Sequence, residues 1–165
     1  MTHDHSNVTI RGATSADVGE IAAFIRELAD YERRAHEVTF TDDGLRKALF
    51  GERPGAEVLL AEVDGAAVGF ALFFANFSTF LGQAGIYLED LFVRPHARGQ
   101  GIGRALLEKL AALAVERGCG RLEWSVLDWN EPAIEFYRRV GADIKPDWRI
   151  CRLTAEGIDK LAAGE

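Results

Sequence analysis

The sequence is poor in the residues that cross-link small proteins or carry them through membranes. Its 165 residues include two cysteines, Cys119 and Cys151, without CxxC spacing. Two cysteines do not make a disulfide framework, so we expect reduced thiols. No apolar run approaches the roughly 20 residues of a membrane span, and no basic segment followed by an apolar one opens the chain. These absences predict a cytoplasmic protein.

Positive charge is also in short supply. Lys and Arg number 19 and Asp and Glu 26, a formal net charge of −7. General nucleic-acid binders and proteins of anionic membrane surfaces depend on positive patches, so we expect neither nucleic acid nor membrane as a partner. The 48% hydrophobic residues are typical of a globular chain. The length favours one domain over residues 8–165, after a flexible N-terminal tail at 1–7.

The order of the predicted elements indicates a mixed α/β fold with one central sheet. Asp64-Gly65 separates two strand patterns and is a strong signal for a tight hairpin. Thr14 with Asp17, and later Thr41, are capping signals for two helices. Antiparallel hairpin strands lead into a βαβ unit, which gives the class. The strand patterns cover 8–11, 57–63, 67–74, 86–93, 121–126 and 148–153, and the helical patterns cover 18–29, 42–50, 101–117, 130–140 and a short polar stretch at the end of the chain.

A glycine-rich stretch between a strand and a long helix is the most informative motif. It reads Arg98-Gly99-Gln100-Gly101-Ile102-Gly103-Arg104. Glycines let backbone amides close on an oxyanion, and a helix N-terminus adds partial positive charge. Two arginines add formal charge. The stretch therefore predicts a phosphate or pyrophosphate site.

Two familiar phosphate loops fit this stretch poorly. A nucleotide-triphosphate P-loop requires Lys-Ser or Lys-Thr after its last glycine, and Ile102-Gly103 stands in that region. A dinucleotide fingerprint starts well at Gly99 and Gly101 but needs a third glycine where Arg104 stands. The strands before the loop also form a hairpin rather than parallel βαβ repeats. A purely structural loop stays open as an alternative.

The motif from Arg98 to Gly103 resembles the pyrophosphate loop of the GNAT superfamily of acetyl-coenzyme A-dependent N-acetyltransferases, and the element order over 8–153 is similar to that fold. The resemblance implies a mostly antiparallel sheet, V-shaped between the third and fourth main strands, with helices on both faces. It also implies a homodimer and no metal. Segments similar to the diamine branch, the spermidine/spermine and thialysine acetyltransferases, are Leu28-Ala29-Asp30-Tyr31-Glu32, Tyr87-Leu88-Glu89-Asp90-Leu91-Phe92-Val93, and Asp128-Trp129-Asn130-Glu131-Pro132 with Phe136-Tyr137-Arg138-Arg139.

The resemblance also implies which residues bind the cosubstrate acetyl-coenzyme A. Backbone groups of the strand before the loop would pair with the pantetheine arm, and the Leu91 amide would polarise the acetyl carbonyl. Amides of the loop would hold the pyrophosphate. The implied cofactor-binding residues are Leu91, Phe92, Val93, Arg98, Gly99, Gln100, Gly101, Ile102, Gly103, Arg104, Asn130, Pro132, Ala133 and Tyr137.

Two residues would carry the chemistry that the resemblance implies. Tyr137 would act as a general acid and protonate the leaving thiolate. Glu89 would act as base, directly or through water, or as a substrate anchor. An amine with a pKa of about 10.4 is protonated at pH 7 and has no lone pair with which to attack. The alternatives are a core tyrosine for Tyr137 and a solvated strand carboxylate for Glu89.

Several carboxylates in one groove would suit an acceptor with two or more ammonium groups. Lys145 stands where the branch tends to carry acidic residues, so the implied acceptors extend from polyamines to short diamines and thialysine-like amino acids. A protein amine as acceptor and a non-catalytic acyl-coenzyme A module are rival functions, and Tyr137 and Glu89 argue against the second. The implied acceptor-side residues are Tyr31, Glu32, Glu89, Glu123, Trp124 and Ser125, with a solvated charge as the alternative for Glu32 and Glu123.

Overall fold

The computed structural model describes residues 7–164. The chain divides into two compact units, one that ends at Ser125 and one that begins at Val126. A single domain over 8–165 therefore remains a prediction. The predicted tail at 1–7 lies, apart from Asn7, outside the described residues.

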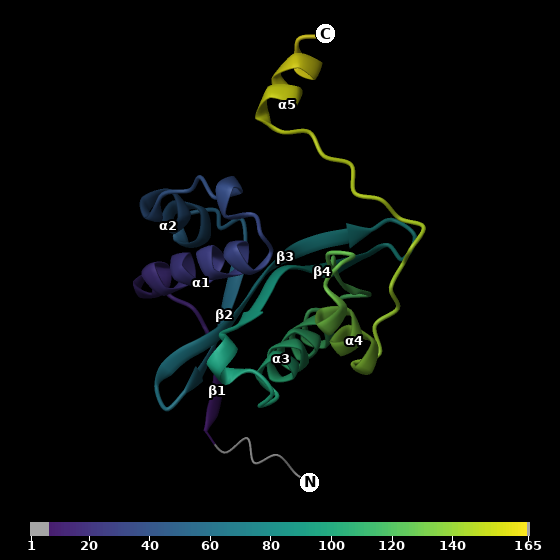
Figure 1. Ribbon diagram of the computed structural model, residues 1–165. Helices are drawn as coiled ribbons and strands as arrows, with labels where there is room; N and C mark the ends of the chain where they lie inside the picture. Colours follow the sequence, from purple (N-terminus) through teal and green to yellow (C-terminus); the bar gives the residue numbers. More distant parts are fainter. Residues whose placement is uncertain (1–6, 165) are drawn as a thin grey trace. The chain divides into compact units, whose positions relative to one another are not determined.

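The first unit is built on an open mixed sheet, shown in Figure 1. Neighbouring strands run antiparallel except for the last pair, which is parallel. This confirms the predicted fold class. Asp64 and Gly65 have φ of 51° and 79°, as the predicted tight hairpin requires. Among the described residues the strand order is β1 (Val8–Gly12), β2 (Glu57–Val63), β3 (Ala66–Ser78), β4 (Gln83–Val93) and β5 (Leu122–Trp124).

Strands β4 and β5 pair over a short stretch and then separate. Their pairing joins Ile86–Leu88 to Leu122–Trp124 and ends there. Beyond this pairing, residues Glu89–Val93 continue β4, which there runs beside β3. Phe73 is opposite Leu88 but Leu72 is opposite Asp90, so Glu89 is the extra residue of a β-bulge.

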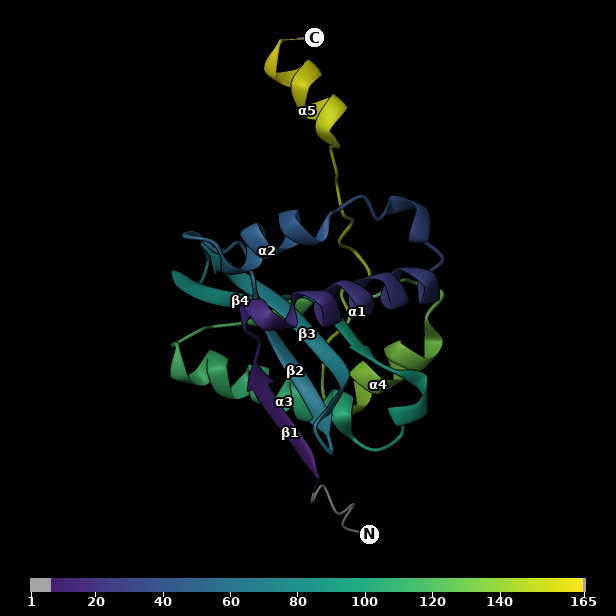
Figure 2. The same ribbon diagram turned by 90° about the vertical axis from the view of Figure 1, so that its left-hand side faces the viewer.

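Helices cover both faces of this sheet (Figure 2): α1 (Val18–Tyr31) and α2 (Asp42–Phe50) lie on one, and α3 (Ile102–Glu116) lies on the other. The apolar stripe of α1 packs Phe24 against Phe70 with ring centroids 5.2 Å apart. Burying each such side chain stabilises the fold by ~1.5–3 kcal/mol. Short 3₁₀ turns are η1 (Ser15–Asp17), η2 (Ala35–Glu37) and η3 (Pro95–Ala97).

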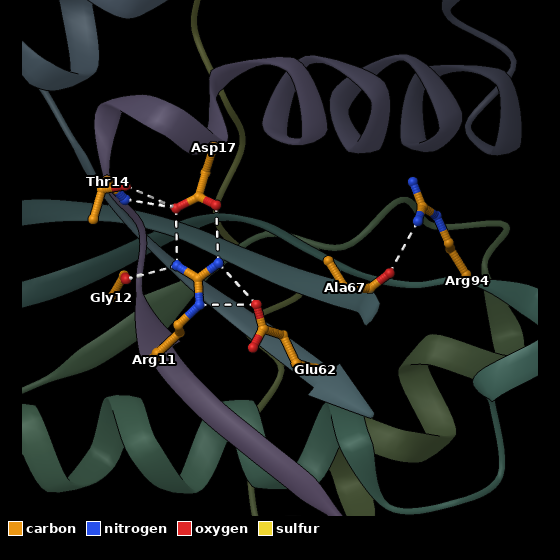
Figure 3. A network of polar contacts seen from close by, with 7 residues as sticks. All are labelled: Arg11, Gly12, Thr14, Asp17, Glu62, Ala67 and Arg94. Atoms are coloured by element: carbon orange, nitrogen blue, oxygen red, sulfur yellow. Dashed lines mark hydrogen bonds and ion pairs between the residues drawn. The ribbon is translucent and has the colours of Figure 1, made fainter. Parts of the chain in front are cut away.

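Arg11 joins the start of α1 to the first two strands, as Figure 3 shows. Its guanidinium donates to both carboxylate oxygens of Asp17 at 2.8 and 2.9 Å and to Glu62 at 2.8 Å. The bond from Arg11 lowers the pKa of Asp17 from 3.8 to about 2. Asp17 also accepts from the Thr14 backbone N–H at 2.7 Å, which confirms the predicted cap.

Arg94 joins the middle of α1 to the end of β4. Its guanidinium donates to the Ala67 carbonyl at 2.9 Å, also drawn in Figure 3. It contacts carboxylate oxygens of Glu20 and Glu27 at 2.7 and 3.1 Å, and it lies 4.3 Å from the Phe24 ring centroid. These contacts fix the position of α1 relative to β4, the strand that contains the bulge.

The second unit contains α4 (Glu131–Arg139) and α5 (Ala155–Ala162). The predicted strand at 148–153 is wrong in the described structure, because no neighbouring strand pairs with its backbone. Trp148, Ile150 and Leu153 are 79%, 69% and 55% exposed. The strands predicted at 67–74 and 86–93 are too short, since β3 extends to Ser78 and β4 begins at Gln83. In the described part of the chain, no helix has the length and apolar composition to cross a bilayer.

Candidate functional site

The glycine-rich loop forms an anion cradle at the start of α3. Gly99 and Gly101 have φ of 76° and 79°, a region that side chains strain. The Ala105 N–H donates to the Gly101 carbonyl at 2.9 Å, so the amides of residues 102–104 precede the helical ladder. Within the described residues no side chain caps this end, and its first turn holds no acidic residue. Such a helix N-terminus fits a pyrophosphate.

Gly69 on β3 lies tightly against the end of β4, next to the start of α3. A Cβ at this position would lie 3.0 Å from the Phe92 carbonyl oxygen, 3.3 Å from Val93 Cγ2 and 3.5 Å from Ile102 Cγ2. Only glycine leaves that space without a shift of the backbone. The sequence analysis did not single out this residue, because its role depends on a strand and a helix distant in the chain.

The two arginines of the loop have different environments. Arg104 Nε donates to Glu108 at 2.8 Å, one turn along α3. Arg98 Nε donates to the Val93 carbonyl at 2.8 Å, and in residues 7–164 no carboxylate forms an ion pair with its guanidinium. The two terminal nitrogens of Arg98 are therefore available to an anion at the loop.

The end of β4 directs alternate backbone groups away from β3. The Arg94 N–H donates to the Val68 carbonyl at 2.8 Å, and Val93 is opposite Gly69. In an antiparallel pair this makes Val93 and Leu91 the residues whose N–H and C=O point outward, past the end of β5. The Phe92 backbone faces β3, and its buried ring belongs to the core. Of the three predicted residues, Leu91 and Val93 thus have the backbone orientation that a pantetheine arm needs.

Three carboxylates gather where the end of α1 meets the β-bulge: Glu32, Glu89 and Asp90. Burial, with the charges of Glu89 and Glu32, raises the pKa of Asp90 from 3.8 to about 7. Burial also raises the pKa of Glu32, as do Glu89 and Glu37, while Arg34 lowers it. Within residues 7–164 no group of His, Cys, Asp or Glu side chains is arranged to hold a metal ion. The negative charge of this carboxylate cluster attracts positively charged groups.

Asp90 is the site residue that the sequence analysis missed. It is opposite Leu72, which packs against the core under α1. Asp90 and Phe92 are two residues apart on β4, so their side chains lie on the same face of the sheet, the face that α1 covers. An apolar residue usually occupies such a position. Its sequence signal is a carboxylate at a position where the strand pattern predicts an apolar residue.

The backbone after α1 holds Glu32 over the bulge. The Arg34 N–H donates to the Ala29 carbonyl at 2.7 Å and the Glu32 N–H to the Leu28 carbonyl at 2.9 Å, which ends the helix. Arg33 has φ of 60°, a left-handed conformation that costs a residue other than glycine ~1–2 kcal/mol. A left-handed residue just past the last turn is a common way for a helix to end.

The predicted acceptor residues near β5 have partners of their own. Glu123 accepts from Asn76 at 3.4 Å and lies 3.9 Å from Arg121. The Ser125 hydroxyl is 2.8 Å from the Tyr87 hydroxyl, and Trp124 is opposite Leu88 in the sheet. The structure thus brings Glu32 and Glu89 together, adds Asp90, and gives Glu123 a separate environment.

The second unit presents the predicted Asn-Glu-Pro helix start. The Ala133 N–H donates to the Asn130 side-chain oxygen at 3.4 Å, and Pro132 occupies the first turn of α4. Tyr137 is 9% exposed, with its ring 5.4 Å from that of Phe136. The chemical role of Tyr137 stays a prediction from its sequence motif.

Comparisons with known proteins agree with this geometry. A model of the acetyltransferase (GNAT) family matches residues 21–142, across the boundary between the two units. A thialysine N-ε-acetyltransferase from Bos taurus is 39% identical over 94% of this chain and 97% of its own length. An L-ornithine N5-acetyltransferase from Arabidopsis thaliana is 35% identical over 92% and 88%. The solved structure of an integron cassette protein from V. cholerae superposes with a TM-score of 0.78, at 29% identity and over 94% and 98% of the two chains.

Proposed function

The chain belongs to the acetyltransferase (GNAT) family, and we propose from this premise which amine it acetylates. It is an acetyl-coenzyme A-dependent N-acetyltransferase that acts on small-molecule amines. The acceptor that we propose carries two amino groups, as a short diamine or as an amino acid with a side-chain amine. Two of its relatives are named for thialysine and L-ornithine, which are amino acids of that kind.

The carboxylate cluster at the end of α1 is the observation that carries this proposal. Three like charges crowd together at Glu32, Glu89 and Asp90, and burial holds the pKa of two of them above their usual values. Such crowding opposes ionisation until positive charge arrives. An acceptor with one ammonium at the reacting position and a second beside Glu32 would supply it.

The loop before α3 supports the proposed cosubstrate site. Its uncapped amides and Arg98 would hold the pyrophosphate, and the outward backbone groups of Leu91 and Val93 would hold the pantetheine arm. When bound, acetyl-coenzyme A supplies the acetyl group as a thioester. We propose that the Leu91 N–H donates to the carbonyl oxygen, where negative charge develops.

The acceptor must lose a proton before its nitrogen can attack. We propose that Asp90 and Glu89 take this proton from the amine, with Glu89 at the exposed bulge as the route to water. A group with a pKa near 7 suits this work, because it can accept a proton and release it at neutral pH. Tyr137 supplies the proton that the sulfur needs.

Glu32→Gln should raise KM for 1,3-diaminopropane several-fold and change KM for propylamine by less than about twofold. The change removes the attraction between the Glu32 carboxylate and the second ammonium of the diamine, which propylamine lacks. At a partly exposed site this attraction is worth about 1 kcal/mol or less. The difference should shrink as salt is added, because ions screen the pair. Initial rates at saturating acetyl-coenzyme A measure both constants.

Glu52→Gln is the matched control, because Glu52 is an exposed glutamate in the turn after α2. It should leave both KM values unchanged. Equal effects of Glu32→Gln on the diamine and the monoamine would overturn the diamine proposal. Acetylation of a peptide amine in preference to every diamine would favour a protein acceptor, and cofactor binding without turnover would favour a non-catalytic module.

Asp90→Asn should stabilise the protein increasingly as pH rises from about 4 to about 7. Because the pKa of Asp90 is raised in the folded state, the folded chain keeps a proton that the unfolded chain releases across this range. The wild type therefore loses stability as pH rises, and the loss levels off above about pH 7. Thermal unfolding midpoints at about pH 4, 5.5 and 7.5 measure this trend.

Asp43→Asn serves as the control for that series, since the Asp43 carboxylate on α2 is 86% exposed. Its difference from wild type should not follow the Asp90→Asn curve. A stability gain of Asp90→Asn that is the same at all pH values would show that burial does not raise the pKa of Asp90.

We also propose that the protein is a cytoplasmic homodimer. The dimer is supported by Trp148, Ile150 and Leu153, whose large apolar side chains are exposed within six residues of chain and would be covered by a second copy. Cys119 and Cys151 are both free thiols, which suits a reducing compartment. Sedimentation that gives a monomer at all concentrations would contradict the dimer, and cell fractionation tests the compartment.

A further inference from the structure

Arg98 touches both halves of the proposed site. Its Nε donates to the Val93 carbonyl at 2.8 Å, which fixes the side chain to the end of β4. Its guanidinium carbon lies 5.1 Å from the centroid of the Tyr31 ring and 5.4 Å from that of Phe92. These distances are those of cation–π contacts. A single side chain thus joins the glycine loop, β4 and α1.

Tyr31 is the last residue of α1, and Glu32 follows it directly. Arg94 holds the earlier turns of the helix through Glu20 and Glu27. The Arg98 contact reaches the last turn, where Tyr31 is 38% exposed. The position of Glu32 therefore depends on a turn against which the loop arginine stacks.

We infer that Arg98 is a positioning residue that couples the pyrophosphate loop to the acceptor end of α1 through the Tyr31 ring. This inference rests on the proposed function. Phosphate oxygens at the loop would fix the two terminal nitrogens of Arg98, and the fixed guanidinium would hold the Tyr31 ring and with it Glu32. The cosubstrate thereby prepares the carboxylate cluster for the acceptor.

The coupling acts equally in both directions, because the free energy that links two binding sites is reciprocal. Loss of the Tyr31 ring removes one of the contacts that orient Arg98, and it should weaken coenzyme A binding even with no acceptor present. An exposed cation–π contact corresponds to about a two- to fivefold change in affinity. If Tyr31 contacts the acceptor alone, its substitution leaves coenzyme A affinity unchanged.

The test is calorimetric titration of coenzyme A into wild type, Tyr31→Leu and Tyr31→Phe without acceptor. Tyr31→Leu removes the ring face but keeps apolar bulk and helix propensity, and it should raise Kd about two- to fivefold. Tyr31→Phe keeps the ring face and should bind as wild type does. An unchanged Kd in Tyr31→Leu, or an equal loss in Tyr31→Phe, overturns the coupling while the proposed function stands. A wild type that does not bind coenzyme A overturns both.

Arg98→Lys tests the same contact from the other side and does not depend on the folding of Tyr31→Leu. Lysine keeps the charge but loses the flat guanidinium that stacks on a ring. At saturating acetyl-coenzyme A, this variant should raise KM for 1,3-diaminopropane about two- to fivefold. Adding Tyr31→Leu to Arg98→Lys should weaken coenzyme A binding no further, and fully additive losses would overturn the coupling.

Discussion

Tyr137→Phe is expected to lower kcat by about 10²- to 10⁴-fold, with little change in coenzyme A affinity. The substitution keeps the ring, which is 9% exposed, and removes the hydroxyl that would protonate the leaving thiolate. General acid catalysis by a positioned side chain is typically worth that factor. Steady-state rates with saturating acetyl-coenzyme A and a diamine measure the loss.

The result is informative only if the variant is folded, so its thermal unfolding midpoint is compared with that of wild type. A midpoint close to that of wild type shows that the variant keeps the fold. Turnover within about threefold of wild type would mean that water or another group protonates the sulfur, because removal of a general acid has a much larger effect. It would leave the cosubstrate site and the acceptor proposal intact.

Gly101→Glu is expected to weaken coenzyme A binding by at least about 100-fold. Two effects contribute to the loss of affinity. A side chain at a φ of 79° strains the backbone, and its negative charge lies beside the amides that would bind the pyrophosphate. Hydrogen bonds to charged groups contribute about 1.5–3 kcal/mol each, so the loss of two of them accounts for this factor. Calorimetric titration gives the affinity directly.

Gly118→Glu separates the charge at the cradle from backbone strain. Gly118 has a φ of 66°, follows α3 at its other end, and has open space where a Cβ would stand. The two variants should lose similar stability, while Gly118→Glu keeps the affinity of wild type. Comparable losses of coenzyme A affinity in both variants would show that the loop at 98–104 does not hold the pyrophosphate.

Local chemistry was sufficient to predict several parts of this protein from its sequence. The cap at Thr14 and Asp17, the hairpin at Asp64 and Gly65, and the helix start at Asn130 all formed as predicted. Each depends on one residue's φ or on a hydrogen bond across three residues. The anion cradle before α3 belongs to the same class, since positive φ and uncapped amides are properties of the loop itself.

The acceptor side was decided by the tertiary structure. The bulge at Glu89 depends on the register between β3 and β4, and the burial of Asp90 depends on α1, which lies far from it in the chain. The stack of Arg98 on Tyr31 likewise joins residues remote in sequence. Strand register, burial and ring contacts arise between segments, so residue spacing does not reveal them.

The wrong strand prediction at 148–153 also has its cause in contacts between distant segments. Alternating residues give Trp148 to Leu153 a strand pattern, but a strand also needs a neighbour to pair its backbone groups, and in the described structure none does so. The sequence by itself thus determined the glycine-rich loop before α3 and the fold class, through local conformation and periodicity. Which carboxylates meet at the proposed acceptor site, and how Arg98 of the loop contacts α1 beside them, was decided only when distant segments packed together.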